Sequence, residues 1–438
     1  MGLGVIVIEP PGAVVRIAAT LEAAGHETWC VGGAVRDALL GRADLDWDLA
    51  TSATPGEVKR LFSRTVPVGI EHGTIGVFGS DSRLYEVTTF RADVETDGRH
   101  AVVKFGVSLE EDLARRDLTV NAIAWSPSRR ELRDPFGGRD DLAKGMIRAV
   151  GVPETRMGED RLRALRAIRF AARFDFRIEP ATWSAIVGSA PALTRLSVER
   201  VFQEWTKTLE QVRRPSLAFE RWRESRTLAV LVPSLADVPA EFFAAVDEVP
   251  LPAGTSRTDR VALRTLTRLA LPFLPLGARG SRAALQALRA SNNDVAFASA
   301  VAESWASSGE ALATAAMQAR PDATALRRIV AQMGRTRVHA TLRVFAAVWA
   351  ARRGRGQPAP SALQVGALSR ALLRMAFRDP IALGDLAVTG DDLRAVGLRP
   401  GPQLGRILHQ LLAQVLVDPT LNTHDDLLRV ARQLAEES

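Results

Sequence analysis

The chain changes character near residue 150. Residues 1–150 hold most of the short, glycine-punctuated segments, whereas the remainder is dominated by Ala, Leu and Arg at helical spacing. From Glu159 onward, Leu162, Leu165 and Ile168 recur at intervals that place them on one side of a helix. The sequence therefore predicts two joined architectures: a small α/β or α+β unit, followed by a long region that is all helical.

Segments of the first part alternate between helix-type and strand-type apolar spacing. The patterns predict helices over 13–24 and 55–62, a helix opening at Gly32, and strands over 28–31, 45–51, 75–78 and 84–89. In the second part we expect helices around 281–289 and 312–320, and Pro/Gly-rich joints at 249–254 and 352–360.

The composition indicates a globular, basic protein. Among 438 residues, 47% are hydrophobic and 24% charged, which is average for globular chains and excludes wholesale disorder or a collagen-like repeat. The net charge is +7 and the pI about 10.4, and only four of the 57 basic residues are Lys. This balance suits a polyanionic partner such as nucleic acid or nucleotides, although a GC-rich genome also raises the Arg content.

Cysteine content and apolar runs predict the compartment. The single cysteine, Cys30, excludes an intrachain disulfide framework and a Cys-rich zinc site. The first residues lack a basic segment and reach Glu9 and two prolines too early for a signal peptide, and no run of about 18 apolar residues follows. We therefore expect a cytoplasmic protein without a membrane span.

The motif GGAVRD lies where a predicted strand gives way to a helix. Its glycines, Gly32 and Gly33, allow backbone N–H groups to close on a phosphate, and Arg36 adds a positive charge. A glycine pair alone is more typical of a tight turn with an Arg/Asp surface pair. The prediction of a phosphate site therefore depends on a second motif.

That second motif is LDWDLAT, residues 45–51. Along a strand, Asp46 and Asp48 point to one side and Trp47 to the other, and two carboxylates on one side suit two magnesium ions. An isolated pair is more typical of a solvated strand edge, but the glycine turn upstream favours the metal site. Glu86, on a neighbouring predicted strand, is equally consistent with a third metal ligand and with a cross-strand partner of a basic residue.

Eight motifs together resemble one family. GGAVRD, LDWDLAT, HGTIGVF, YEVTTFR, DLARRDLTVNAIA, DPFGGRDDL, IRAVGVP and EDRLRALRAIRFAARF occur in the order seen in class II CCA-adding enzymes and bacterial poly(A) polymerases. The resemblance covers residues 15–210 nearly continuously and extends more weakly to 397–412 and 421–428. It implies a catalytic head built like that of DNA polymerase beta, followed by an all-helical neck, body and tail.

The resemblance also implies domain limits and site residues. The expected domains are a head over 1–150, a neck over 151–215, a body over 216–352 and a tRNA-binding tail over 353–438. The matching positions imply metal ligands at Asp46 and Asp48, triphosphate contacts at Gly32, Gly33 and Arg36, and ribose or phosphate contacts at Arg116, Asp117 and Asn121.

Base choice is expected at the start of the neck. Asp160 and Arg163 are three residues apart, with Arg166 a turn further, so the sequence predicts that they share one helix face. A carboxylate acceptor beside a guanidinium donor complements cytosine and adenine, which present an amine next to a ring-nitrogen acceptor, and rejects uracil and guanine. Outside this context, a surface ion pair would be the preferred interpretation. In the family, the matching residues pair with the base edge.

The predicted function is template-independent addition of CCA to the 3′ end of tRNA, from CTP and ATP and with Mg²⁺ as the cofactor. A loop over 91–104 matches the segment with which the family switches from C to A addition, but it is slightly shortened here. An A-adding enzyme or a poly(A) polymerase is the alternative within the same chemistry. A non-catalytic RNA-binding relative is disfavoured by the intact carboxylates, and nucleotide transfer to a small molecule would not need the Arg-rich helical region.

Overall fold

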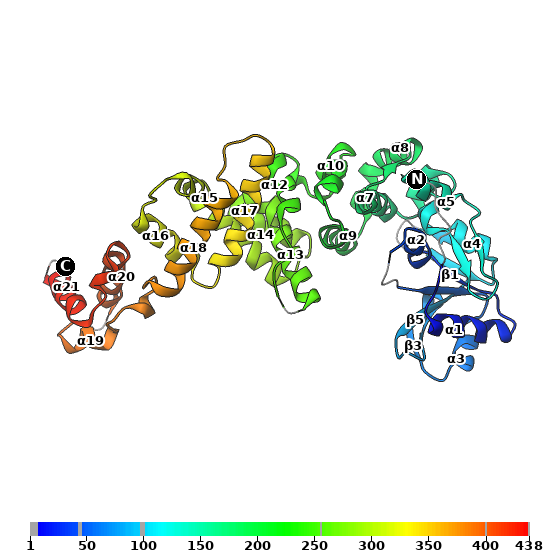
Figure 1. Ribbon diagram of the computed structural model, residues 1–438, viewed down its shortest axis with the longest axis horizontal. Coiled ribbons are helices and arrows are strands. Elements are labelled where there is room, and N and C mark those ends of the chain that lie inside the picture. Colours follow the sequence, from blue (N-terminus) through cyan, green and yellow to red (C-terminus); the bar gives the residue numbers. More distant parts are fainter. Residues whose placement is uncertain (1–7, 43–45, 97–100, 255, 399–400, 437–438) are drawn as a thin grey trace. The chain divides into compact units, whose positions relative to one another are not determined.

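The computed structural model describes residues 8–42, 46–96, 101–254, 256–398 and 401–436. The chain divides into two compact units, Met1–Pro233 and Ser234–Ser438. The first unit combines a mixed sheet with helices and the second is helical, so the predicted α+β class followed by a helical region is confirmed (Figure 1).

A seven-stranded sheet forms the centre of the first unit. Its spatial order is β3 (Thr65–Gly69), β4 (Thr74–Phe78), β5 (Leu84–Thr89), β2 (Asp48–Thr51), β1 (Thr28–Val31), β8 (Ala124–Ser126) and β9 (Glu131–Arg133). In this sheet β2 and β5 pair in parallel, with Leu49 opposite Val87, and β1 pairs antiparallel with β2, with Val31 opposite Asp48. The last residue of β1 and the first residue of β2 therefore lie side by side, next to the middle of β5.

Two further strand pairs form separate small sheets. An antiparallel hairpin consists of β6 (Arg91–Thr96) and β7 (Ala101–Phe105). The strands β10 (Met146–Ile147) and β11 (Arg177–Ile178) pair in parallel. Since β11 lies after residue 159, the prediction that the chain is all helical from there was wrong at this point.

The helices of the first unit are between five and fourteen residues long. They are α1 (Gly12–Ala23), α2 (Gly33–Leu39), α3 (Pro55–Leu61), α4 (Leu109–Ala114), α5 (Gly138–Lys144), α6 (Pro153–Glu159), α7 (Leu162–Phe174), α8 (Pro180–Ser189), α9 (Val198–Gln211), α10 (Ser216–Glu224) and α11 (Thr227–Leu231). One core cluster joins the sheet to α4: Trp29, Val31, Ala50, Phe90, Leu109, Leu113, Ala122, Ala124 and Val150 are all buried. This packing fixes α4 and the segment after it beside the strand ends.

The second unit contains α12 (Ala240–Ala244), α13 (Arg257–Ala270), α14 (Gly277–Ala287), α15 (Asn292–Met317), α16 (Ala323–Met333), α17 (Val338–Gly354), α18 (Ala362–Arg378), α19 (Gly390–Ala395), α20 (Pro402–Val417) and α21 (His424–Glu436). The predicted joint at 249–254 lies between elements but inside this unit. The predicted joint at 352–360 was wrong in its first residues, because α17 continues to Gly354 and packs against α18. The tail helices α19, α20 and α21 share a small core around Leu393, Leu411 and Leu427.

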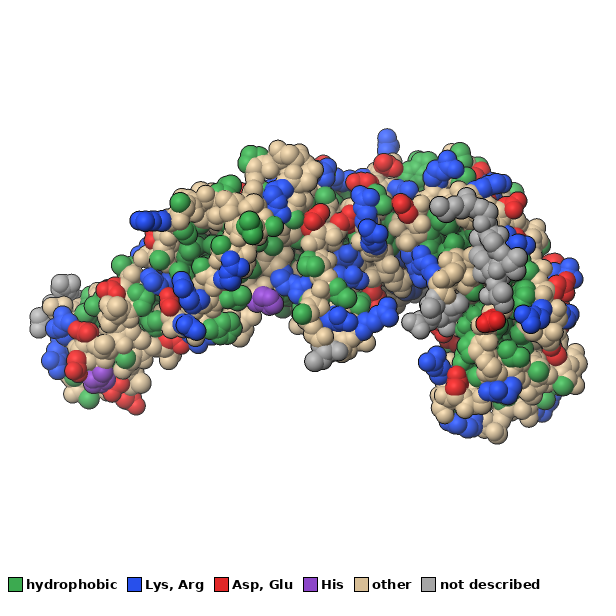
Figure 2. Space-filling model, in the orientation of Figure 1, with side chains coloured by type: hydrophobic (Ala, Val, Ile, Leu, Met, Phe, Trp, Pro, Cys, Tyr) green, Lys and Arg blue, Asp and Glu red, His purple; other side chains and the backbone are tan. Residues whose placement is uncertain are grey.

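Basic side chains are spread over both units on the face shown in Figure 2, with acidic side chains among them. None of the helices in the described ranges is long and apolar enough to span a bilayer.

Candidate active site

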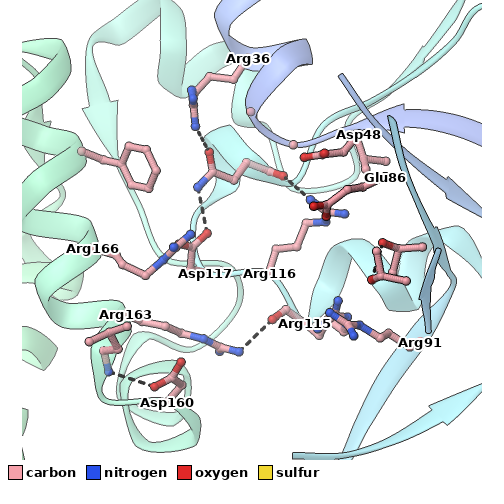
Figure 3. Close-up of a pocket in the computed structure, with 18 of the residues that line it drawn as sticks. Arg36, Asp48, Glu86, Arg91, Arg115, Arg116, Asp117, Asp160, Arg163 and Arg166 are labelled. Carbon is pink, nitrogen blue, oxygen red and sulfur yellow. Dashed lines mark hydrogen bonds and ion pairs between the residues drawn. The ribbon is translucent and has the colours of Figure 1, made fainter. Parts of the chain in front are cut away.

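A cavity of about 530 Å³ opens in the first unit beside the end of β1, the start of β2 and the middle of β5 (Figure 3). The site residues predicted from the sequence line it, with the exception of Asp46: Gly32, Gly33, Arg36, Asp48, Glu86, Arg116, Asp117, Asn121, Asp160, Arg163 and Arg166. The structure thus brings together residues from β1, β2, β5, the segment after α4, and the start of α7.

The glycine turn between β1 and α2 forms one wall. Gly32 has φ 72°, a left-handed conformation that glycine adopts without strain. A Cβ atom at Gly32 would lie only 2.8 Å from Nη1 of Arg116, so any side chain here would displace that guanidinium. The turn therefore needs glycine both for its backbone and for the close approach of Arg116.

Carboxylates gather at the start of β2 and on β5 beside it. Asp48 is the first residue of β2, and Glu86 immediately precedes Val87, the partner of Leu49 on β5. Burial, and then the negative charges of Asp46 and Glu86, raise the pKa of Asp48 to about 7, against an opposing effect of Arg116. The predicted strand over 45–51 was wrong at residues 46 and 47, since β2 starts at Asp48, and residue 45 lies outside the described residues. Nevertheless Asp46 is exposed while Trp47 is 4% exposed, consistent with opposite sides.

This crowding fits a bound cation. A divalent ion between Asp46 and Asp48 would relieve the repulsion that raises the pKa of Asp48. Within the described ranges, no group of three or more His, Cys, Asp and Glu side chains is arranged to hold a metal ion. The aspartate pair stays a prediction as the donor set, and Glu86 adds negative charge beside Asp48.

A chain of hydrogen bonds crosses the floor of the cavity. Nη1 of Arg36 donates to Oδ1 of Asn121, and Nδ2 of Asn121 donates to Oδ1 of Asp117 at 2.9 Å. Nε of Arg166 then donates to Oδ2 of Asp117 at 2.7 Å. Burial would raise the pKa of Asp117, but the charge of Arg166 and the hydrogen bonds from Asn121 and Arg166 outweigh it and lower that pKa to about 2. Asp117 is thus a fixed anion that joins α2 to α7.

Arg36 is buried, and several contacts hold its guanidinium in place. It is 3% exposed, its guanidinium lies about 5.0 and 4.9 Å from the ring centroids of Phe170 and Phe174, and Nε donates to Asp37 at 2.9 Å. Its charge therefore acts on the cavity from a fixed position.

The predicted base-reading pair has a different arrangement from the one expected. Asp160 does not share a helix face with Arg163, because its backbone is extended (φ −143°, ψ 106°) and separates α6 from α7. Oδ1 of Asp160 accepts from the N–H of Leu162 at 3.0 Å, and Oδ2 pairs with Arg200 of α9 at 2.7 Å. The prediction of one helix face was wrong, although both side chains line the cavity.

Arg163 has partners of its own. Nη1 pairs with Glu159 at 2.6 Å, and Nη2 donates to the backbone carbonyl of Arg115 at 3.0 Å. Asp160 and Arg163 are therefore oriented separately, one by Arg200 and the other by Glu159 and Arg115. This leaves a carboxylate and a guanidinium at the same end of the cavity.

Sequence reasoning missed several lining residues, chiefly Arg91, Arg115 and Arg200. Arg91 and Arg115 stand inside motifs that were recognised, YEVTTFR and DLARRDLTVNAIA, so their motifs were a usable signal. Arg200 follows Asp160 by forty residues, and no local spacing links the two.

Comparisons with known proteins identify relatives of this chain. Residues 28–148 match the family described as Poly A polymerase head domain, and residues 175–238 match one described as Probable RNA and SrmB-binding site of polymerase A. The CCA-adding enzyme of Lactiplantibacillus plantarum is 35% identical over 421 residues, which cover 95% of each chain. The CCA-adding enzyme of Streptococcus suis is 51% identical over 191 residues, and this match spans 47% of that relative's length.

Solved structures extend the similarity to the whole fold. The crystal structure of Bacillus stearothermophilus CCA-adding enzyme in complex with CTP superposes with a TM-score of 0.74 at 31% identity, covering 98% of this chain and 99% of that one. Thermotoga maritima CCA-adding enzyme, complexed with tRNA, has a TM-score of 0.67 at 22% identity and shows the same fold. On this full-length similarity, the chain belongs to the family of CCA-adding enzymes that carry the poly(A) polymerase head.

Proposed function

We propose that this chain adds C and A, from CTP and ATP, to the 3′ end of tRNA without a nucleic-acid template. The observation that carries the proposal is the meeting of Asp48 with Asp160 and Arg163 in one cavity of a chain that aligns with CCA-adding enzymes over nearly its full length. The proposed reaction uses tRNA as its macromolecular partner and takes place in the cytoplasm.

The carboxylates supply the site of bond formation. Asp46 and Asp48 would hold Mg²⁺, which activates an attacking hydroxyl and stabilises charge on the phosphate when it is bound. The tRNA 3′-hydroxyl attacks the α-phosphate, and pyrophosphate leaves. The turn at Gly32 and Gly33 and the charge of Arg36 bind the triphosphate, while Arg116, Asp117 and Asn121 position the ribose and phosphates.

Base selection is assigned to Asp160 and Arg163 in the same cavity. Oδ2 of Asp160 can accept from the exocyclic amine of cytosine or adenine, and the guanidinium of Arg163 can donate to the adjacent ring nitrogen. Uracil and guanine present a carbonyl and an N–H at these places, so each partner would be left with a repulsive or unpaired contact. Such unpaired buried groups discriminate strongly against the wrong base.

The test is extension of tRNA transcripts that end at the discriminator base, at C and at CC, with Mg²⁺ and each nucleoside triphosphate alone or mixed. Addition of CCA that then stops supports the proposal. The match to a poly(A) polymerase head keeps a second candidate: a long A ladder on many RNAs would identify that activity. Growth of only the CC-ended transcript, by one A, would identify an A-adding enzyme, and the absence of any extension would contradict the proposal.

Replacing Arg163 with Ala should relax base choice more than it weakens triphosphate binding. The substitution removes the donor at the ring nitrogen, but it leaves the glycine turn, Arg36 and Asp117 in place. We expect the ratio of CTP to UTP incorporation efficiency to fall by about 10-fold or more, since each lost hydrogen bond to a charged group is worth roughly 1.5–3 kcal/mol. Single-turnover incorporation of all four nucleotides measures this, and unchanged rejection of UTP and GTP would refute the role of Arg163. Arg161→Ala, two residues earlier and outside the cavity lining, is the matched control.

A further inference from the structure

Asp112, a buried carboxylate that contacts residues of the cavity lining, has no role in the mechanism above. It lies on α4 between Leu109 and Leu113, two core residues, and its side chain is 2% exposed. Burial raises the pKa of Asp112, but the charges of Arg116 and Arg115 outweigh this and keep the pKa below its usual range. Asp112 is therefore a buried anion whose position is fixed by the core.

Three hydrogen bonds connect Asp112 to residues that line the cavity. Oδ1 accepts from Nε of Arg115 at 3.2 Å, and Oδ2 accepts from Nη2 of Arg116 at 3.1 Å. The backbone N–H of Arg91 also donates to Oδ1, at 3.4 Å. Arg91, Arg115 and Arg116 all line the cavity, and Figure 3 shows Arg91 and Arg115 on its side opposite Arg166. One carboxylate thus contacts three of the residues that form this wall.

The hydrogen bond from the Arg91 N–H to Asp112 holds the start of a hairpin. Arg91 is the first residue of β6, so its N–H lies at the root of the β6–β7 hairpin, where Arg91 pairs with Phe105. The preceding residue, Phe90, belongs to the same core cluster as Leu109 and Leu113 of α4. Asp112 therefore joins the root of the hairpin to α4 and the core of the first unit.

The bond to Arg115 leads in the other direction. The backbone carbonyl of Arg115 accepts from Nη2 of Arg163 at 3.0 Å. The side chain of Arg115 is 20% exposed and that of Arg163 is 10% exposed, so both are partly screened from solvent. A continuous path of short contacts therefore runs from the hairpin root through Asp112 and Arg115 to the guanidinium proposed to read the base.

We propose that Asp112 is a positioning residue that couples the root of the β6–β7 hairpin to base reading by Arg163, through Arg115. The proposal rests on the function proposed above. Asp112 itself touches no reacting atom; it sets the place of the Arg115 backbone, and with it the donor that faces the base. It also holds Arg116 against the glycine turn, so its loss affects triphosphate binding as well.

The experiment uses the full chain with Asp112→Asn, which keeps the shape of the side chain but removes its charge and directs an amide N–H₂ at one of the arginines. We expect the KM for CTP to rise and the ratio of CTP to UTP incorporation efficiency to fall by about 10-fold, with a smaller change in kcat. Asp112→Glu keeps the charge and should restore part of the discrimination. Glu110→Gln, an exposed residue of the same helix, is the matched control and should behave as the wild type.

A double-mutant cycle separates coupling from a merely structural role. Because the path ends at Arg163, Arg163→Lys should cost little further discrimination once Asp112→Asn is present, whereas independent roles would give additive losses. Amide hydrogen exchange at the hairpin root should also be faster in Asp112→Asn than in Glu110→Gln. Additive losses, or wild-type discrimination in folded Asp112→Asn, would overturn the proposal.

The wild-type protein is assayed first on tRNA, so that failure of the proposed function is visible before any variant is compared. If Asp112→Asn does not fold, as judged by circular dichroism, Arg115→Gln is used instead. This substitution removes the guanidinium that donates to Asp112, at a partly exposed position. In that variant a loss of discrimination that is not additive with Arg163→Lys supports the coupling. Additive behaviour contradicts it.

Discussion

Asp48→Asn is expected to abolish nucleotide incorporation and, at the same time, to make the protein more stable above pH 7. The loss of activity follows from the loss of an anionic metal ligand at the reacting phosphate, where the metal contributes several kcal/mol, or on the order of 10³-fold in rate. Single-turnover incorporation of CTP measures this loss. Near-normal turnover of Asp48→Asn would remove Asp48 from the metal site.

The gain in stability has an electrostatic cause. In the folded protein the pKa of Asp48 is raised from 3.8 to about 7 by burial, Asp46 and Glu86. Above pH 7 the folded state must hold an ionised carboxylate that the unfolded state solvates better, whereas below about pH 4 both states are protonated and the cost disappears. Allowing for solvent screening at a partly buried side chain, we expect Asp48→Asn to recover roughly 1–3 kcal/mol at pH 8.

Thermal unfolding in the presence of a chelator tests this. The difference in Tm between Asp48→Asn and the wild type should be a few degrees at pH 8, and it should shrink steadily as the pH falls to 4. Asp140→Asn, at an exposed aspartate of the same unit, controls for removal of a charge and should show no such trend. A destabilised Asp48→Asn at pH 8 would contradict the electrostatic account.

The raised pKa of Asp48 also predicts that protons compete with Mg²⁺ for this carboxylate. Below about pH 7, Asp48 is protonated in the folded protein, and Mg²⁺ must displace that proton to bind. The affinity of the protein for Mg²⁺, measured by calorimetry without nucleotide, should therefore fall by up to about tenfold for each pH unit below 7. An affinity that does not change between pH 5.5 and 8 would show that Asp48 is not a ligand.

The parts of this structure that local patterns determine agree closely with the sequence-based expectations. The strands over 28–31 and 84–89 begin and end where predicted, because both segments are rich in the β-branched and aromatic residues that favour strands. The break at Asp160 was not predictable, because residues 159–163 contain neither Gly nor Pro and suit a helix. It depends on a carboxylate that caps Leu162 and pairs with Arg200, a partner forty residues away.

The same distinction applies to the candidate site. The recognised motifs contain most of the lining residues, but only some of these were predicted as site residues. The partners that orient those residues come from other elements: Arg115 supplies a carbonyl to Arg163, and Asp112 holds the root of a hairpin twenty-one residues before it. Such contacts depend on the packing of α4 against the sheet, which one-dimensional spacing does not encode.

Asp117→Asn is expected to have the largest effect on stability. Asp117 is 7% exposed and pairs with Arg166 at 2.7 Å, so the substitution leaves a largely buried guanidinium without its charge partner. Breaking a buried pair on one side typically costs 3–5 kcal/mol, and since the side chain of Arg166 is 33% exposed we expect roughly 2–4 kcal/mol here. Chemical unfolding at pH 7 measures the loss.

The pH dependence of this loss has the opposite sign from that of Asp48. The folded pKa of Asp117 is about 2, below the unfolded value of 3.8, so its ionised form stabilises the fold fully above pH 4. The stabilisation disappears as the pH falls through about 2, and the wild type and Asp117→Asn should then converge. A difference that persists unchanged down to pH 2 would indicate that packing, and not charge, is the cause.

A double variant separates the role of Asp117 in stability from its proposed role at the ribose. Removing both partners leaves no unpaired buried charge, so Asp117→Asn with Arg166→Gln should be more stable than Asp117→Asn alone. Discrimination between ribonucleotides and 2′-deoxynucleotides should remain lost in the double variant, because the carboxylate that would face the 2′-hydroxyl is still absent. If discrimination returned together with stability, Asp117 would act only through the fold, and the ribose contact would have to come from Arg116 or Asn121.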